Sequence, residues 1–254
     1  MNRNLRLALA VIVTVAAVKL FSERVNRFLW NDRAAPDFFW SLLGQVAYYL
    51  VPAIIILLLF HPPRKLATEL GIARGLLPGL GWALLFTLPM LIGYSLLGKF
   101  DHSYPLHKNL LFALKDGFRE EEFYRAFLFG QLFRQARWGF IPAVAVNGLI
   151  FGLAHLYQAH SLADSAAVFG ITFAGAIWFA WLFIEWKENI WVPVFLHTCM
   201  NFYWDLFSAE QSAVGGWWLN LPRLLTIALS VLITVYFARR ADGLRIQRKR
   251  LWRL

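Results

Sequence analysis

The sequence has little of what stabilises secreted domains or keeps soluble ones in solution. It contains a single cysteine, Cys199, which excludes an internal disulfide and leaves the cellular compartment open. Charged residues make up 16% of the 254 residues and apolar residues 59%, whereas a soluble domain holds about 25% and 45–50%. The mean hydropathy is +0.53. These values exclude an ordinary soluble domain and predict an integral membrane protein.

The net charge of +10 does not indicate nucleic-acid binding. Seven of the 25 Lys and Arg residues follow Ala238, directly after an apolar run, and no nucleic-acid-binding motif accompanies them. Such a cluster is typical of a cytoplasmic anchor that contacts anionic lipid headgroups. We therefore expect residues 239–254 to form a basic cytoplasmic tail whose partner is the bilayer.

Long apolar runs are the main feature that the sequence does have. Eight of them approach the ~20 residues that cross a bilayer as a helix. The first run follows Arg3, but no small-residue cleavage site closes it, so we expect a retained helix. The prediction is an all-α polytopic membrane helix bundle with a buried polar site, in one domain over residues 1–254. The expected spans are 5–21, 38–60, 76–97, 118–135, 140–157, 164–185, 189–207 and 219–238.

The distribution of Lys and Arg predicts the orientation of the bundle. With the N-terminus in the cytoplasm, the cytoplasmic side holds 15 of these residues and the opposite side six. Both termini are then cytoplasmic, provided that the number of spans is even. Together with the composition, this predicts an integral protein of a bacterial inner membrane.

Three polar patterns lie inside apolar runs, where one charged side chain costs roughly 2.5–3.5 kcal/mol. Such groups persist when they pair, line a wet cavity or do chemistry. Together, two carboxylates, two imidazoles and an amide could activate a water and hold an oxyanion. The patterns are Glu120-Glu121-x-x-x-Arg125, Phe151-x-x-x-His155 and His197-x-x-x-Asn201.

Each pattern also has an ordinary structural explanation. Acidic residues are common in the first turn of a helix, where the helix dipole favours them. A lone histidine such as His155 is more often a hydrogen-bonded core residue than a catalyst. His197 and Asn201, four residues apart on one helix face, could equally hold neighbouring helices together.

In this order on separate membrane helices, the patterns resemble the CAAX protease and bacteriocin-processing (CPBP, or Abi) family of intramembrane proteases. The resemblance covers about residues 118–207. It departs where Ala126 stands in place of the usual glycine and where Glu122 extends the acidic pair. It implies a glutamate-type endopeptidase that hydrolyses a peptide bond of a membrane-anchored or C-terminally tagged protein.

The resemblance also implies a role for each matching residue. The first glutamate would activate the attacking water, and the first histidine would hold that water from its other side. The second histidine and the asparagine would donate hydrogen bonds to the oxyanion. The implied catalytic residues are Glu120, His155, His197 and Asn201, and the implied supporting pair is Glu121 with Arg125.

Two alternatives stay open. Glu120, His155 and His197 could supply three ligands of a catalytic zinc ion. Because no His-Glu-x-x-His helix is present and Asn201 is a poor zinc ligand, we expect no metal. The chain could also be a non-catalytic membrane protein that binds a peptide, such as a bacteriocin-immunity factor. A transporter is disfavoured, because no inverted repeat is visible.

Other polar residues carry less functional weight. His61 falls in a loop and is expected to be solvated, and Glu185 and Glu188 are expected to be wet beside a turn. Residues 106–114 are too short to span and are expected to lie at the interface or to re-enter. The predicted site lies in the outer half of the membrane, which favours secreted or membrane-anchored precursors as substrates.

Overall fold

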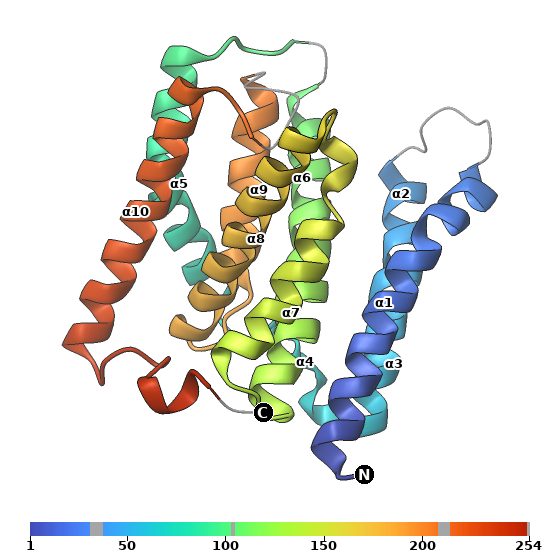
Figure 1. Ribbon diagram of the computed structural model, residues 1–254. Helices are drawn as coiled ribbons and strands as arrows, with labels where there is room; N and C mark the ends of the chain where they lie inside the picture. The colour runs from blue at the N-terminus through green and yellow to red at the C-terminus, as the bar shows by residue number, and fades with distance from the viewer. Residues whose placement is uncertain (31–37, 103–104, 208–213, 253–254) are drawn as a thin grey trace.

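A computed structural model describes residues 1–30, 38–102, 105–207 and 214–252, and for residues 22–30 it describes the backbone alone. Every regular element in these ranges is helical and none is a strand, which confirms the all-α prediction. Both termini lie at the same end of the bundle (Figure 1).

The chain passes through the bundle in a series of helices, some of them built from consecutive segments. The longer segments are α1 (Arg3–Trp30), α2 (Phe38–Gln45), η1 (Val46–Leu50), α3 (Val51–Phe60), α5 (Leu76–Leu97), α6 (Leu106–Glu120), η3 (Glu121–Phe129), η4 (Gln131–Gln135), α7 (Phe140–Leu153), α8 (Leu162–Glu185), α9 (Trp191–Leu206) and α10 (Trp217–Arg240). The short turns are η2 (Pro63–Lys65), α4 (Leu66–Glu69), η5 (Leu156–Gln158) and η6 (Arg248–Arg250).

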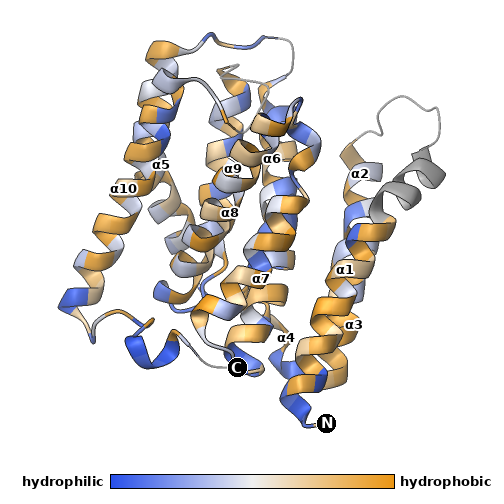
Figure 2. Ribbon diagram, viewed as in Figure 1, coloured by the Kyte–Doolittle hydropathy of each residue, from blue (hydrophilic) through white to orange (hydrophobic). Residues whose placement is uncertain are grey.

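Six helices in the described part of the chain are long and apolar enough to cross a membrane. They carry large exposed side chains such as Leu59, Leu96 and Leu232, as lipid-facing helices do. Figure 2 shows hydrophilic residues gathered at the bundle end that holds both termini. These helices confirm six of the predicted spans: Arg3–Phe21, Phe38–Phe60, Leu76–Leu97, Phe140–Gln158, Leu162–Glu185 and Trp217–Arg240.

The predicted spans 118–135 and 189–207 are helical but do not qualify as spans by length and composition, so the count of about eight is confirmed only for six. Helix α9 has 16 residues, and the run that contains 118–135 carries the charged site residues. Both are inner helices: α9 packs against α5 and α6. An inner helix faces protein rather than lipid, so its sequence does not need an apolar surface all round.

Segments α6, η3 and η4 form one continuous helix over residues 106–135, and the residues at their junctions keep right-handed helical dihedrals. Residues 106–114 are therefore the beginning of this helix and not a separate re-entrant segment, whereas their place at the interface stays a prediction. Glu120 and Glu121 lie in the middle of this helix, about 20 Å from its start at 1.5 Å per residue. This position excludes the interpretation that they merely decorate a helix N-terminus.

The segment that follows Glu120 is wound as a π-helix, from Glu121 to Phe129. A π-helix bonds each N–H to the carbonyl five residues earlier, and such turns occur often at functional sites. In this segment every residue is buried.

A close contact between α6 and α9 brings the acidic pair near the second histidine. A Cβ added at Gly117 would lie 2.7 Å from Thr198 Oγ1 and 3.2 Å from the Val194 carbonyl oxygen. Only a glycine permits this approach. Gly117 thus sets the distance between the helix that carries the glutamates and the helix that carries His197.

A second polar cluster occupies the bundle end near the termini. We call it the Glu69 cluster, and it consists of His61, Glu69, Gln131, Arg134 and Gln135. The amide of Gln135 donates to Glu69 Oε1 at 2.9 Å, and that of Gln131 donates to Glu69 Oε2 at 3.1 Å. The Arg134 Nη2 donates to the Glu69 carbonyl oxygen at 2.6 Å. His61 Nε2 lies 2.9 Å from Gln131 Oε1.

The structure corrects the expectation for His61 and adds partners for the partly exposed Glu188 and Glu185. His61 is not a solvated loop residue, because it is 5% exposed and bonds to Gln131. Glu188 pairs with Arg134 at 3.3 Å. Glu185 accepts the backbone N–H groups of residues 245 and 246 at 2.8 and 3.0 Å, which holds the middle of the basic tail against the end of α8. Arg253, counted in that tail, lies outside the described residues.

Candidate active site

Glu120 is the centre of the candidate site. Its Oε2 atom lies 3.9 Å from His155 Nε2 and 3.9 Å from His197 Nε2. The exposed fractions of the three side chains are 15%, 15% and 14%, so the space between them is sheltered but reachable. The fold therefore brings together three residues that the sequence placed on three separate helices.

His155 is the second residue after the end of α7, and its ring is oriented by the last turn of that helix. Its Nδ1 atom lies 2.7 Å from the carbonyl oxygen of Phe151. A carbonyl oxygen only accepts, so Nδ1 carries the hydrogen and donates it. The ring also packs on Phe151, with 4.3 Å between the ring centroids. A neutral His155 held this way presents the lone pair of Nε2 to Glu120.

His197 is oriented by Glu121, the second glutamate of the pair. Its Nδ1 lies 2.7 Å from Glu121 Oε1. The other carboxylate oxygen, Glu121 Oε2, lies 3.1 Å from Arg125 Nε. The Arg125 guanidinium in turn lies 4.4 Å from the ring centroid of Phe151 and 5.2 Å from that of Phe179. Glu121 and Arg125 are both almost fully buried, so they form a closed ion pair behind His197.

Asn201 lies one helical turn after His197 on the same face of α9 and is half-buried. No hydrogen bond holds its amide within the described part of the chain, whereas the Nδ1 atoms of both histidines are engaged. The amide is therefore available to a ligand.

Arg119 is a site residue that the sequence reasoning missed. Its Nη2 donates to Glu120 Oε1 at 2.6 Å. Its position directly before a buried acidic pair was the one available signal.

Lys19 of α1, an otherwise apolar span, also lies near the site. Its Nζ is 5.3 Å from the ring centroid of Tyr124 and 5.4 Å from that of Tyr49.

The three candidate zinc ligands lie farther apart than a bound zinc ion would hold them. Tetrahedral zinc with bonds of about 2.0–2.1 Å holds its ligand atoms about 3.4 Å apart. Glu120 Oε2 is 3.9 Å from each Nε2. Within the described ranges, no group of three or more His, Cys, Asp or Glu side chains is arranged to hold a metal ion.

The fold and the site together define an integral membrane protein whose helix bundle encloses a carboxylate and two imidazoles. Residues 103–203 match the family model described as type II CAAX prenyl endopeptidase Rce1-like. The chain thus contains a domain of this CAAX endopeptidase family, the CPBP or Abi family, which confirms the resemblance. A domain of this family implies the function of an intramembrane protease, a hydrolase that acts on a protein or peptide.

The matched range begins before residue 118 and runs from α6 into α9. It includes every residue of the three polar patterns and Arg119. No curated protein matches the chain in sequence.

Proposed function

We propose that the protein is a glutamate-type intramembrane endopeptidase that hydrolyses a peptide bond of a membrane-anchored or C-terminally tagged protein. One observation carries the proposal: Glu120 Oε2 lies 3.9 Å from the Nε2 atoms of both His155 and His197. This separation is too long for a direct hydrogen bond and leaves room for a bridging water. A water held there touches both a base and an imidazole.

The orientation of that water follows from two acceptors. The Nε2 of neutral His155 and the Oε2 of Glu120 each accept one of its hydrogens, so a lone pair of the water oxygen faces the substrate carbonyl. When this oxygen bonds to the carbonyl carbon, its proton passes to Glu120. Glu120 then gives the proton to the leaving amine as the C–N bond breaks, and no acyl-enzyme forms.

The oxyanion that develops on the substrate needs donors, and we assign them to His197 and Asn201. A carboxylate on Nδ1, here that of Glu121, favours the doubly protonated imidazolium, whose Nε2–H can donate. The half-buried Asn201 amide supplies the second donor. Arg125 offsets the charge of Glu121 and holds it in place. No step of this mechanism uses a metal ion.

The orientation in the membrane follows from the excess of Lys and Arg on the side of both termini. If that side is cytoplasmic, His155 lies toward the outer end of α7 and Glu120 lies near the middle of its helix. A site in the outer half of the membrane fits secreted or membrane-anchored precursors, such as proteins with a C-terminal sorting helix. The inner membrane of a bacterium is the proposed location.

The basic tail supports contact with anionic lipid headgroups. Its described basic residues are exposed, and they lie at the end of the bundle that also carries the exposed residues Arg3 and Lys65. A cluster of this kind attracts anionic lipids by about 1 kcal/mol per basic residue. The exposed tail residues are Arg239, Arg240, Arg245, Arg248, Lys249 and Arg250.

The proposal is tested with the purified full-length protein in detergent and a panel of quenched peptides. Glu120→Gln removes the base and should lower kcat by roughly 10²–10⁴-fold. The matched control is Glu122→Gln, the same change two residues along, because Glu122 faces the apolar residues Leu50 and Leu70 instead of the histidines. This control should keep kcat within about three-fold, as changes away from the reacting groups do.

Equal cleavage by Glu120→Gln and the unchanged protein would overturn the proposal. Peptide binding without any cleavage, unaffected by Glu120→Gln and by His155→Ala, would favour a non-catalytic peptide-binding or immunity protein instead.

A further inference from the structure

Glu120 has two carboxylate oxygens, and they lie in different surroundings. Oε2 faces the two imidazoles, whereas Oε1 accepts a hydrogen bond from Arg119 Nη2 at 2.6 Å. We infer that Arg119 is a positioning residue that fixes the rotamer of Glu120, so that Oε2 alone meets the attacking water. This inference rests on the proposed function of Glu120 as the base.

The contact between Arg119 and Glu120 is not an ordinary helix surface pair. Adjacent residues of a helix diverge by about 100°, and charged partners usually lie three or four residues apart. The usual partner of Arg119 at that spacing is Asp116, and Arg119 Nη1 lies 3.5 Å from Asp116 Oδ1. The guanidinium thus joins two carboxylates, one on either side, and its planar fork restricts where Glu120 can point.

Two residues of the α2–η1 helix support this arrangement, one through Asp116 and one against the guanidinium itself. Gln45 Nε2 donates to Asp116 Oδ1 at 2.8 Å, and the Tyr49 ring centroid lies 5.3 Å from Arg119 Cζ. A chain of contacts therefore runs from Gln45 through Asp116 and Arg119 to Glu120. Because Gln45 and Tyr49 precede the matched family range, a helix outside that range helps to place the reacting carboxylate.

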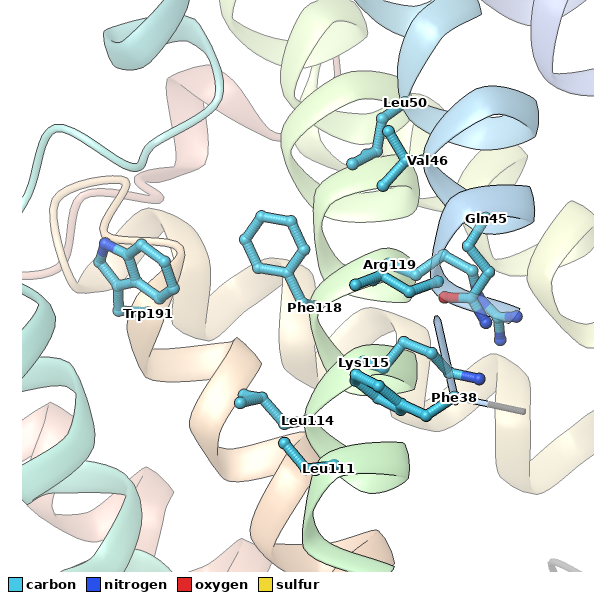
Figure 3. A pocket seen from close by; sticks show the side chains of 11 residues that line it. Phe38, Gln45, Val46, Leu50, Leu111, Leu114, Lys115, Phe118, Arg119 and Trp191 are labelled. Atoms are coloured by element: carbon cyan, nitrogen blue, oxygen red, sulfur yellow. The ribbon is translucent and has the colours of Figure 1, made fainter. Parts of the chain in front are cut away.

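Arg119 is also accessible to a small molecule. It lines a cavity of about 350 Å³ between α2 and α6, and its side chain is 24% exposed. Figure 3 shows Arg119, Lys115 and Gln45 near one another, with Phe118 and Trp191 on the other side. Truncating Arg119 would leave a space that opens into this cavity, so a free guanidinium ion can reach Glu120 from it.

The kinetic consequence of losing Arg119 is a misplaced base rather than a missing one. A displacement of about 1 Å in a reacting group costs on the order of 10²-fold in rate. We therefore expect Arg119→Ala to lower kcat by roughly 10–10²-fold and to leave KM nearly unchanged. Arg119→Lys should recover part of the loss, since an ammonium keeps the charge but not the fork.

The test measures kcat and KM of full-length Arg119→Ala and Arg119→Lys in detergent, with and without millimolar guanidinium chloride. Guanidinium should restore part of the kcat of Arg119→Ala by occupying the place of the lost side chain. Arg134→Ala is the matched control, because Arg134 is a buried arginine of the same helix that belongs to the Glu69 cluster. It should lose thermal stability, with kcat of the folded protein unaffected by guanidinium.

Three results would overturn the inference. They are an unchanged kcat in Arg119→Ala, a loss confined to KM, and a loss that follows the amount of folded protein without rescue by guanidinium. If Arg119→Ala does not fold, Asp116→Asn takes its place and should lower kcat with KM unchanged; an unchanged kcat in it would overturn the inference. Glu120→Gln is measured alongside: if it too keeps full activity, the proposed function fails, and if it alone is inactive, only the role of Arg119 fails.

Discussion

Two polar clusters lie along the helix that runs through residues 106–135, and each contains a glutamate and a histidine. In the Glu69 cluster, both oxygens of the carboxylate accept hydrogen bonds from glutamine amides, at 2.9–3.1 Å. In the candidate site, one oxygen of Glu120 accepts from Arg119, and the other faces two imidazole nitrogens at 3.9 Å. The first carboxylate has its partners; the second has one oxygen left for a ligand.

This difference separates a structural cluster from a reactive one better than residue type does. Buried polar groups that are fully bonded make a fold rigid and unique. A buried carboxylate with one oxygen held and the other directed at a gap is prepared for a bound water. The exposed fractions agree with this distinction, because the Glu69 side chain is 6% exposed and the Glu120 side chain, which must meet a substrate, is 15% exposed.

The largest effect predicted from this comparison concerns an amide in the site. Asn201→Ala should lower kcat by roughly 10²–10³-fold with little change in KM, because an oxyanion donor acts mainly in the transition state. Steady-state kinetics on a cleaved quenched peptide measure both parameters.

Asn189→Ala is the control for that change, because the Asn189 amide already donates to the Gly75 carbonyl oxygen at 3.1 Å. It should lower the melting temperature and leave kcat of the folded protein intact. Equal losses of kcat in both variants would contradict the assignment of Asn201.

The Glu69 cluster should respond in stability rather than in rate. Glu69→Gln leaves buried glutamine amides with fewer acceptors and should lower the free energy of unfolding by about 1–3 kcal/mol. Thermal melting in detergent and kcat per folded molecule are the two measurements. A fall in kcat beyond ten-fold with an unchanged melting temperature would mean that this cluster takes part in the reaction.

The smallest predicted effect is that of metal removal. Dialysis against a strong chelator should leave the rate within about two-fold, because the proposed mechanism activates the water with Glu120 alone. Loss of activity with chelator, followed by recovery with zinc, would contradict the metal-free mechanism. It would also mean that Glu120 and the two histidines move together to bind the ion. Metal analysis of the active protein gives an independent measurement.

The sequence predicts the outer helices well and the inner ones less well. A lipid-facing helix must be apolar along a full membrane thickness, so Leu76–Leu97 could be delimited from the sequence. The inner helix over residues 106–135 could not, because Lys115, Asp116 and Gly117 interrupt its hydropathy and resemble a loop. Only the fold shows that α2 provides partners for these charges.

The candidate site, like the helices, could be predicted in part from the sequence. Glu120, His155 and His197 stand out because they interrupt apolar runs, and the fold brings them together. Arg119 and the Glu69 cluster do not stand out, because they follow or precede polar stretches. Residues as distant in sequence as Gln45 and Asp116 become partners only through the packing of two helices.

The π-helical winding of residues 121–129 has a consequence for changes in chain length. A π-helical turn holds one residue more than an α-helical turn would, so deleting one residue there would permit the commoner α-helix. A second deletion or an insertion, which the helix could not absorb in this way, would rotate everything that follows by about 100° relative to Glu120. Gln131 and Gln135 would then turn away from Glu69 while Glu120 stayed in place. Substitutions can thus test each cluster separately, whereas such a change of length breaks the alignment of one cluster with the other, so the length of this segment is under stronger constraint than its composition.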